Sequence, residues 1–197
     1  MIGRRRFLLG LCGTAVLVSG CTPAPMRGSA SHKIYTSLTD LAADATDIAQ
    51  VICRRIVASR YDGASTAADG GIPTKIIEFE ATSVSQGSAL HSGERFFSPI
   101  TDWKKLDLGE PVAVAEGNQL VLFLERVETK GTPLDDLSVV YPIVGVSAGM
   151  FDVRNDTAQA RDPGVEFTAP SGRRLVRANG LADIPIADLL VLRPGKS

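Results

Sequence analysis

Gln119-Leu120-Val121-Leu122-Phe123-Leu124 is apolar at every position after the first. Successive side chains of a β-strand point to opposite faces, so a strand with this sequence is apolar on both of its faces. The pair Gly117-Asn118 just before it is a turn signal. We therefore expect residues 119–127 to form the central strand of a sheet.

Other segments have the pattern of shorter antiparallel strands. Residues 77–82 alternate apolar and polar side chains, which is typical of a half-buried strand. Residues 48–59 are rich in β-branched residues and lack glycine and proline, which predicts a strand with a twist or bulge near Arg54 and Arg55. Further strands are expected over residues 95–100, 139–146, 150–154 and 175–178. Pro142 favours an edge or bulge position, and residues 61–73 are expected to form a hairpin loop.

Two short helices are expected, one at each end of the strand-rich region. Ser37 and Asp40 form a variant of the capping box at the start of a helix over residues 37–45. Residues 184–193 fit a closing helix, with Asp183 as N-cap and Pro185 in the first turn. The sum is a mainly β fold of five to seven antiparallel strands. It predicts a small Greek-key barrel of the OB type, or a small sandwich.

Composition points to one globular domain without a strong electrostatic signature. The 197 residues include 21 Lys and Arg against 22 Asp and Glu, a formal charge of −1, and the hydrophobic fraction is 44%. A disordered chain would be less apolar, and a nucleic-acid binder would carry a basic excess. We therefore expect no nucleic-acid partner.

The N-terminus has the layout of an export signal. Arg4, Arg5 and Arg6 precede an apolar stretch over residues 7–18. Val18-Ser19-Gly20-Cys21 then resembles a bacterial lipobox, in which the chain is cleaved between Gly20 and Cys21 and the cysteine thiol is acylated. This predicts a lipoprotein signal peptide over residues 1–20, a tether over 21–36 and a single β-barrel domain over 37–197. An ordinary signal peptide is the alternative.

The same region resembles a twin-arginine export motif. Arg4-Arg5-Arg6-Phe7-Leu8 fits the pattern Arg-Arg-x-Phe-Leu, although Gly3 and Leu9 depart from its usual flanks, so the general secretory route stays open. Cleavage after Gly20 would leave a formal charge of −4. The acyl chains on Cys21, and not attraction to anionic lipid, would then hold the protein at the extracytoplasmic face of the cell membrane.

Four sequence blocks resemble a widespread family of bacterial exported proteins and lipoproteins. The blocks are Ala45-Thr46-Asp47-Ile48, residues 79–87 from Phe79 to Gly87, residues 117–124, and Gly149-Met150-Phe151. Their order is also similar to the OB-like barrel of netrin modules and tissue inhibitors of metalloproteinases. The resemblance implies this fold and leaves the function open. The inhibitors' metal-chelating N-terminal cysteine does not carry over, because Cys21 would be acylated and has no partner cysteine.

Gly145-Val146-Ser147-Ala148-Gly149 matches the Gly-x-Ser-x-Gly pattern of hydrolase nucleophiles. That arrangement requires a helix after the serine and a histidine later in the chain. Residues 150–153 instead have a strand pattern, and no histidine follows Ser147. We expect a β-turn here.

The sequence predicts neither a metal centre nor a cofactor. His32 lies in the tether, His91 lies in a loop, and these two histidines with one thiol do not give the spacing of a zinc site. Cys53 is expected to be a small buried hydrophobe and not a redox thiol. No intramolecular disulfide is available once Cys12 leaves with the signal and Cys21 is acylated.

The carboxylates suggest two further kinds of site. Asp135-Asp136 and the segment 152–156 could hold calcium but lack EF-hand spacing, so solvated loops are expected. Glu78 and Glu80 share one strand face and suggest a pair of glycosidase carboxylates, although they fit the solvent-facing side of a strand better.

Trp103-Lys104-Lys105 is a candidate ligand surface, because a ring can stack on a glycan while lysines neutralise its charge. An exposed rim is the alternative.

Together these patterns predict a membrane-anchored envelope lipoprotein. Its β domain would be a binding or assembly module and not an enzyme, and its partner an envelope protein or glycan. One alternative is an envelope hydrolase using carboxylates. Another is a carrier with an apolar cavity lined by Ile77, Phe79, Leu122 and Val144.

Overall fold

The computed structural model describes Lys33, Tyr35 and residues 37–106, 113–161, 167–168, 174–175 and 183–196. The export signal with Arg4, Arg5, Phe7, Leu8 and Gly20 lies outside the described residues, as do Cys21, His32 and residues 176–178. The expectations for these positions stay predictions. None of the described helices is long and apolar enough to cross a membrane.

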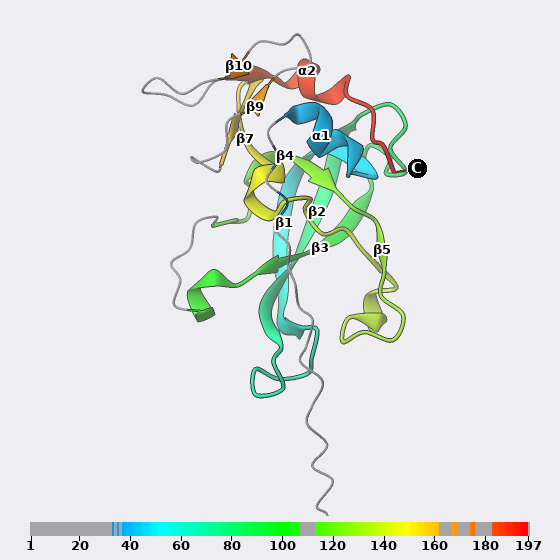
Figure 1. The fold of residues 1–197 in the computed structure, drawn as a ribbon, viewed down its shortest axis with the longest axis vertical. Helices are drawn as coiled ribbons and strands as arrows, with labels where there is room; N and C mark the ends of the chain where they lie inside the picture. The colour runs from blue at the N-terminus through cyan, green and yellow to red at the C-terminus, as the bar shows by residue number, and fades with distance from the viewer. Residues whose placement is uncertain are drawn as a thin grey trace, which may run out of the picture. The chain divides into compact units, whose positions relative to one another are not determined.

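The fold is mainly β (Figure 1), as the sequence predicted. Seven antiparallel strands form one sheet in the order β11-β8-β7-β4-β1-β2-β3. Their bounds are β1 (Asp47–Asp62), β2 (Ile72–Val84), β3 (Arg95–Thr101), β4 (Gln119–Leu124), β7 (Met150–Arg154), β8 (Thr157–Ala160) and β11 (Ile184–Pro185). Two small pairs join β5 (Val127–Glu128) to β6 (Val139–Val140) and β9 (Phe167–Thr168) to β10 (Arg174–Leu175).

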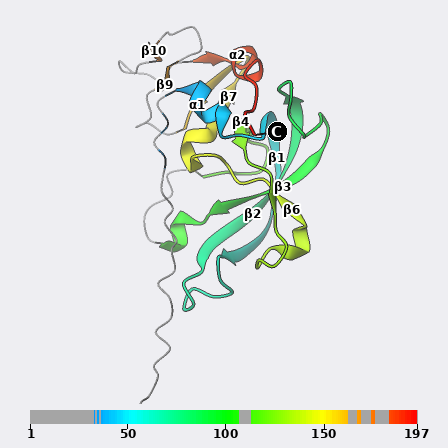
Figure 2. The same ribbon diagram turned by 45° about the vertical axis from the view of Figure 1, so that its right-hand side comes forward.

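The helices are short. They are α1 (Leu38–Ala43) and α2 (Ile186–Leu190), with the 3-10 turns η1 (Trp103–Leu106), η2 (Asp135–Leu137) and η3 (Val146–Gly149). Ser37 caps α1 as expected, and its hydroxyl accepts the N–H of Asp40 at 3.0 Å. In both ribbon views α1 and α2 lie at one end of the sheet, and the β1–β2 ribbon extends away from that end (Figures 1 and 2).

The strand order β4-β1-β2-β3 is that of a Greek key, because the fourth strand returns beside the first. The sheet is open, with β11 and β3 at its edges. The segment after β6 touches both β3 and β4. The N–H of Tyr141 donates to the carbonyl of Phe97 at 2.8 Å, and Ile143 forms an isolated bridge with Leu124. The described edge strands β3 and β11 are not paired with each other, so the sheet does not close into a continuous barrel.

β4 is central, as its two apolar faces predicted. It pairs with β1 on one side and β7 on the other, and residues 120–124 are fully buried. Leu120, Leu122 and Leu124 belong to a core with β1, β2 and β3, whereas Val121 and Phe123 pack in a second core beneath α1 and α2. One strand therefore supplies side chains to two hydrophobic cores.

β1 is longer than expected and carries the predicted irregularity. Its register against β2 shifts between Cys53 and Arg55, and again between Ile56 and Ala58. A bulge inserts an extra residue and re-aims the side chains that follow it. As a result Arg54 and Arg55 both reach glutamates of β2.

Two expected elements have other bounds in the structure, and one strand was not expected. Residues 139–146 do not form one strand, because β6 ends at Val140, Pro142 lacks an N–H, and Gly145 adopts φ 65°. The closing helix begins at Ile186, because Ile184 pairs with Ala158 of β8, and Asp183 instead accepts a hydrogen bond from the Gln159 side chain. Strand β8 itself was missed, since Thr157–Ala160 has no strong alternation.

A buried carboxylate fastens the β2–β3 connection to β1. Asp47 is fully buried, and its Oδ1 accepts the N–H of Leu90 at 2.8 Å while its Oδ2 accepts the Thr46 hydroxyl at 2.8 Å. The next residue, Ile48, donates its N–H to the Ser88 hydroxyl at 3.2 Å. The start of β1 thus holds residues 88–90 in place.

We expect Asp47→Ala to lower the free energy of unfolding by about 2 kcal/mol, because a buried N–H loses its acceptor. Urea denaturation measures this, and hydrogen exchange at the Leu90 amide should accelerate. Asp135→Ala is the matched control, since Asp135 is exposed, and should change stability by less than about 0.5 kcal/mol. Equal losses for the two variants would contradict this role of Asp47.

Tyr35 fixes the chain where it enters the domain. Its ring packs in the core beneath α1, and its hydroxyl donates to Asp44 Oδ2 at 2.9 Å. Burial, and then this hydrogen bond, raise the pKa of Tyr35 to about 12. A tyrosine in an unfolded chain ionises near pH 10.

The contribution of Tyr35 to stability is complete below pH 10 and is lost as the pH rises towards 12. We therefore expect the stability difference between the parent and Tyr35→Phe to shrink by about 2 kcal/mol between pH 9 and pH 12. Urea denaturation across this range measures it. A difference that does not vary with pH would show that the Tyr35 hydroxyl is not held as described.

Candidate functional site

A polar pocket of about 580 Å³ lies where β4 and β7 meet. It is lined by Gly117, Asn118, Gln119, Asp152, Val153, Arg154 and Asn155. Its carboxylate is already engaged, because Arg161 Nε lies 2.8 Å and Nη2 lies 2.7 Å from Asp152 Oδ1. Arg161 Nη1 also donates to the carbonyl of Ala113 at 2.7 Å. Glycoside hydrolysis requires two carboxylates, and this pocket has one, held in an ion pair.

The oxygen-rich loops do not assemble into a metal site in the described part of the chain, where no three His, Cys, Asp or Glu side chains are grouped for a metal. Asp136 instead pairs with Arg60, whose Nη2 lies 2.8 Å from Asp136 Oδ2. The hydrogen bond from Arg60 lowers the pKa of the Asp136 carboxyl. This pair ties η2 to the end of β1.

Glu78 and Glu80 form an ion-pair cluster with three arginines. Arg54 Nη2 lies 2.9 Å from Glu80 Oε1, and Arg55 Nε lies 2.6 Å from Glu78 Oε2. Arg95 Nε also donates to Glu80, and hydrogen bonding from Arg54 lowers the pKa of Glu80. Glu78 is buried, so the expectation that both glutamates lie on a solvent-facing side was wrong for Glu78. The β1 bulge explains this, because it brings Arg55 over Glu78.

The Gly-x-Ser-x-Gly segment is a turn, as expected. Ser147 lies inside the 3-10 turn η3, which leads directly into β7 and not into a helix. The two glycines have packing roles. A Cβ at Gly145, which has φ 65°, would lie 2.7 Å from the Tyr35 ring, and one at Gly149 would collide with the carbonyl oxygen of Val144. Both glycines of the Gly-x-Ser-x-Gly pattern are thus explained by packing, because each lies where a larger side chain would not fit.

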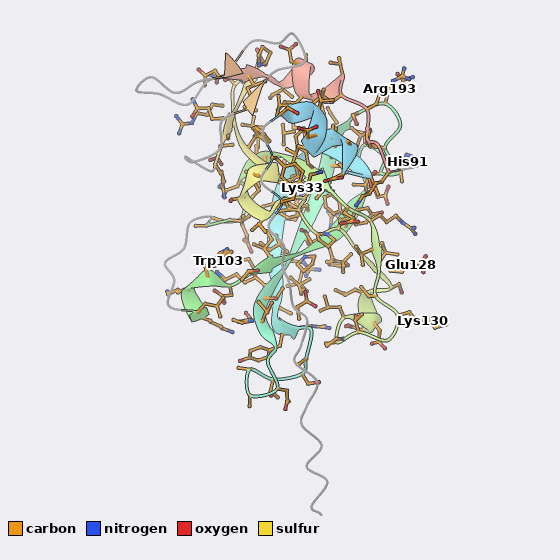
Figure 3. The ribbon with its side chains drawn as sticks, viewed as in Figure 1. Lys33, His91, Trp103, Glu128, Lys130 and Arg193 are labelled. Atoms are coloured by element: carbon orange, nitrogen blue, oxygen red, sulfur yellow. The ribbon has the colours of Figure 1, made fainter. Side chains whose placement is uncertain are left out.

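The thiol and the described histidine lie in different surroundings, one buried and one exposed. Cys53 is buried, as expected, and burial raises the pKa of its thiol, which makes it a poor nucleophile at neutral pH. His91 lies exposed in the β2–β3 connection, on the opposite side of the molecule from Trp103 in Figure 3.

Trp103, Lys104 and Lys105 lie together on η1, as their sequence adjacency requires. Lys104 and Lys105 are exposed, but Trp103 is half-buried. Its indole Nε1 is buried without a hydrogen-bond partner in the described part of the chain. The neighbouring Asp102 is buried, with Lys75 Nζ 3.3 Å from its Oδ1. The Trp103 ring is therefore less available for stacking than the sequence suggested.

An apolar pocket of about 190 Å³ lies between the β1–β2 ribbon, β3 and the segment leading into β7. We call this the β3 pocket. Its lining residues are Asp62, Ile72, Thr74, Pro99, Ile100, Thr101, Pro142, Ile143, Val146 and Met150. Ile72 is 48% exposed at this site, which is high for a residue of its size. Asp62 is the one titratable group in the lining.

The β3 pocket was not predicted from the sequence. The expected cavity residues Ile77, Phe79, Leu122 and Val144 are all buried in the hydrophobic cores and line neither of the two pockets. One sequence feature could have indicated an exposed apolar site. Ile72 and Pro73 come at the end of a loop that otherwise has few large apolar residues.

Comparison of this chain with protein-family models, with curated proteins and with solved structures finds no match.

We expect Gly149→Ala to lower the free energy of unfolding by about 2–3 kcal/mol, because the added methyl meets backbone that cannot move freely. Ser147→Ala should change it by less than about 1 kcal/mol. Urea denaturation measures both variants. If Ser147→Ala abolished hydrolysis of p-nitrophenyl acetate by the folded protein, the assignment of η3 as a structural turn would be wrong.

Proposed function

We propose that this chain is a lipoprotein, held at the extracytoplasmic face of a bacterial membrane by acylated Cys21, whose β domain is a binding module. The observation that supports binding is the β3 pocket, an apolar hollow of about 190 Å³ beside a half-exposed Ile72. Exposed apolar surface next to a concavity is typical of interaction sites. The lipobox at residues 18–21 supports the anchoring.

The arrangement of charges favours binding over catalysis. Several of the described carboxylates are engaged by cations: Glu78 and Glu80 by arginines, Asp152 by Arg161, and Asp136 by Arg60. General acid–base catalysis needs groups whose pKa lies near the operating pH. Hydrogen bonds from Arg54 and Arg60 instead lower the pKa of Glu80 and of Asp136, which moves these two carboxyl groups away from neutral pH.

The length of the tether sets how far the β domain can lie from the membrane. Lys33, the first described residue, comes twelve positions after Cys21, and a chain of that length spans at most roughly 40 Å. The proposed partner is an envelope protein or glycan within that distance of the membrane. Neither a cofactor nor a nucleic acid is part of this proposal.

Replacing Cys21 tests the anchor. We expect Cys21→Ala, expressed in a bacterial host that processes lipoproteins, to leave the membrane fraction and to lose labelling by an alkyne-tagged fatty acid. Cys53→Ala is the matched control, because it removes the other cysteine of the mature chain, and it should stay labelled and membrane-bound. Unchanged membrane binding of Cys21→Ala would overturn the anchoring proposal.

A further inference from the structure

We propose that an extended segment of an envelope protein adds to the outer edge of β3 and places an aromatic side chain in the β3 pocket, with a basic residue two positions away facing Asp62. This inference rests on the proposed binding function and names the partner's chemistry. Three independent features of the described residues support it: the backbone direction at the β3 edge, the size of the pocket and the charge at its rim.

The backbone of β3 turns hydrogen-bonding groups outward next to the pocket. The carbonyl of Phe97 points away from β2, because it accepts the N–H of Tyr141, while the N–H of Asp102 points towards β2 and donates to Pro73 at 2.7 Å. In an antiparallel strand these directions alternate, so Pro99 and Thr101 face outward like Phe97. Pro99 lacks an N–H, which suits an edge position, but its carbonyl and both backbone groups of Thr101 are directed to the open side.

The open edge and the pocket form one surface. Segment 141–143 lies beside β3 at Phe97, where the Tyr141 N–H donates to the Phe97 carbonyl, and then pairs with Leu124 of β4 through Ile143. The distance between this segment and the rest of β3 therefore increases after Phe97. The pocket lies in the fork between them, since its lining comes from Pro99, Ile100 and Thr101 on one side and from Pro142 and Ile143 on the other. Strand addition typically combines main-chain hydrogen bonds with pockets for alternate side chains.

The volume fits one aromatic side chain. Apolar cavities of about 150 Å³ bind benzene, whereas drug-sized ligands occupy about 300 Å³ or more. At about 190 Å³ the β3 pocket is suited to a single ring and too small for an acyl chain of membrane-lipid length. Val146 belongs to the pocket lining and has φ 57°. A positive φ is energetically costly for a β-branched residue, and such strained backbone is often found at binding sites.

The charge at the rim selects a cation. Asp62 is exposed and belongs to the pocket lining, and that lining contains no lysine or arginine. A ring that enters the pocket from a strand would be followed two residues later by a side chain on the same face. A lysine or arginine there would lie near the Asp62 carboxylate. An exposed pair of this kind changes affinity only a few-fold and weakens with salt.

A set of blocked pentapeptides tests the proposal against the full mature chain. The probe is acetyl-Thr-Phe-Thr-Lys-Thr-amide, with one comparator in which Phe is Ala and another in which Lys is Glu. Binding is followed by amide chemical shifts in NMR titrations. We expect shifts centred on the Thr101 amide and the pocket lining. Affinity should fall at least tenfold for the Ala peptide and two- to fivefold for the Glu peptide.

Two protein variants separate the contributions. Asp62→Asn should remove the preference for Lys over Glu while leaving the preference for Phe over Ala, and Asp135→Asn is its matched control on an exposed carboxylate outside the pocket. Thr101→Pro deletes the outward N–H and should weaken all peptides. Because Asp62→Asn leaves the strand backbone untouched, it keeps the test valid even if Thr101→Pro fails to fold.

The inference is overturned if the Ala peptide binds as tightly as the Phe peptide, if the shifts map away from β3, or if Asp62→Asn retains the Lys preference. None of these outcomes affects the location of the Cys21→Ala protein. Failure of the peptide site is therefore distinguishable from failure of the membrane anchor.

Discussion

The fold depends on one constraint, the burial of both faces of β4. A strand covered on one side can lie at the surface of a small sheet, but residues 120–124 need apolar partners on both faces. One core takes side chains from β1, β2, β3 and β7, and the other takes them from α1, α2, β1, β7 and β8. Each fully buried aliphatic or aromatic side chain contributes about 1.5–3 kcal/mol, so the five buried side chains of β4 together contribute roughly 8–15 kcal/mol.

The ends of the chain and the ribbon follow from this arrangement. α1 and α2 cover the second core, and the chain after α2 stays beside α1, where the N–H of Gly195 donates to the carbonyl of Ala42 at 3.0 Å. The part of β1 beyond Cys53 has no β4 partner and projects with β2 as a ribbon. That projection, together with the divergence of segment 141–143 from β3, leaves the β3 pocket open. The proposed binding site is thus a consequence of where the core ends.

The sequence predicted the elements whose patterns are local and strong. The two-faced apolar run at 120–124, the capping serine at Ser37 and the change of pattern at Arg54 each correspond to an observed feature. The features that the sequence did not predict depend on contacts between residues that are distant in the chain. Ile184 joins a sheet because β8 is there, Glu78 is buried because a bulge aims Arg55 over it, and the β3 pocket combines residues 62 to 150, whose adjacency no spacing rule reveals. The signal and tether stay predictions, as does the resemblance to exported lipoproteins.

The central claim is that an acylated module holds a partner at the membrane, and mass spectrometry of the protein extracted gently from a bacterial envelope tests it most directly. The account predicts a denatured mass equal to the chain beginning at Cys21 plus its acyl groups. It also predicts, under native conditions, a further discrete mass of a bound protein that is lost on denaturation. An unprocessed, unacylated chain without any bound component would contradict the account.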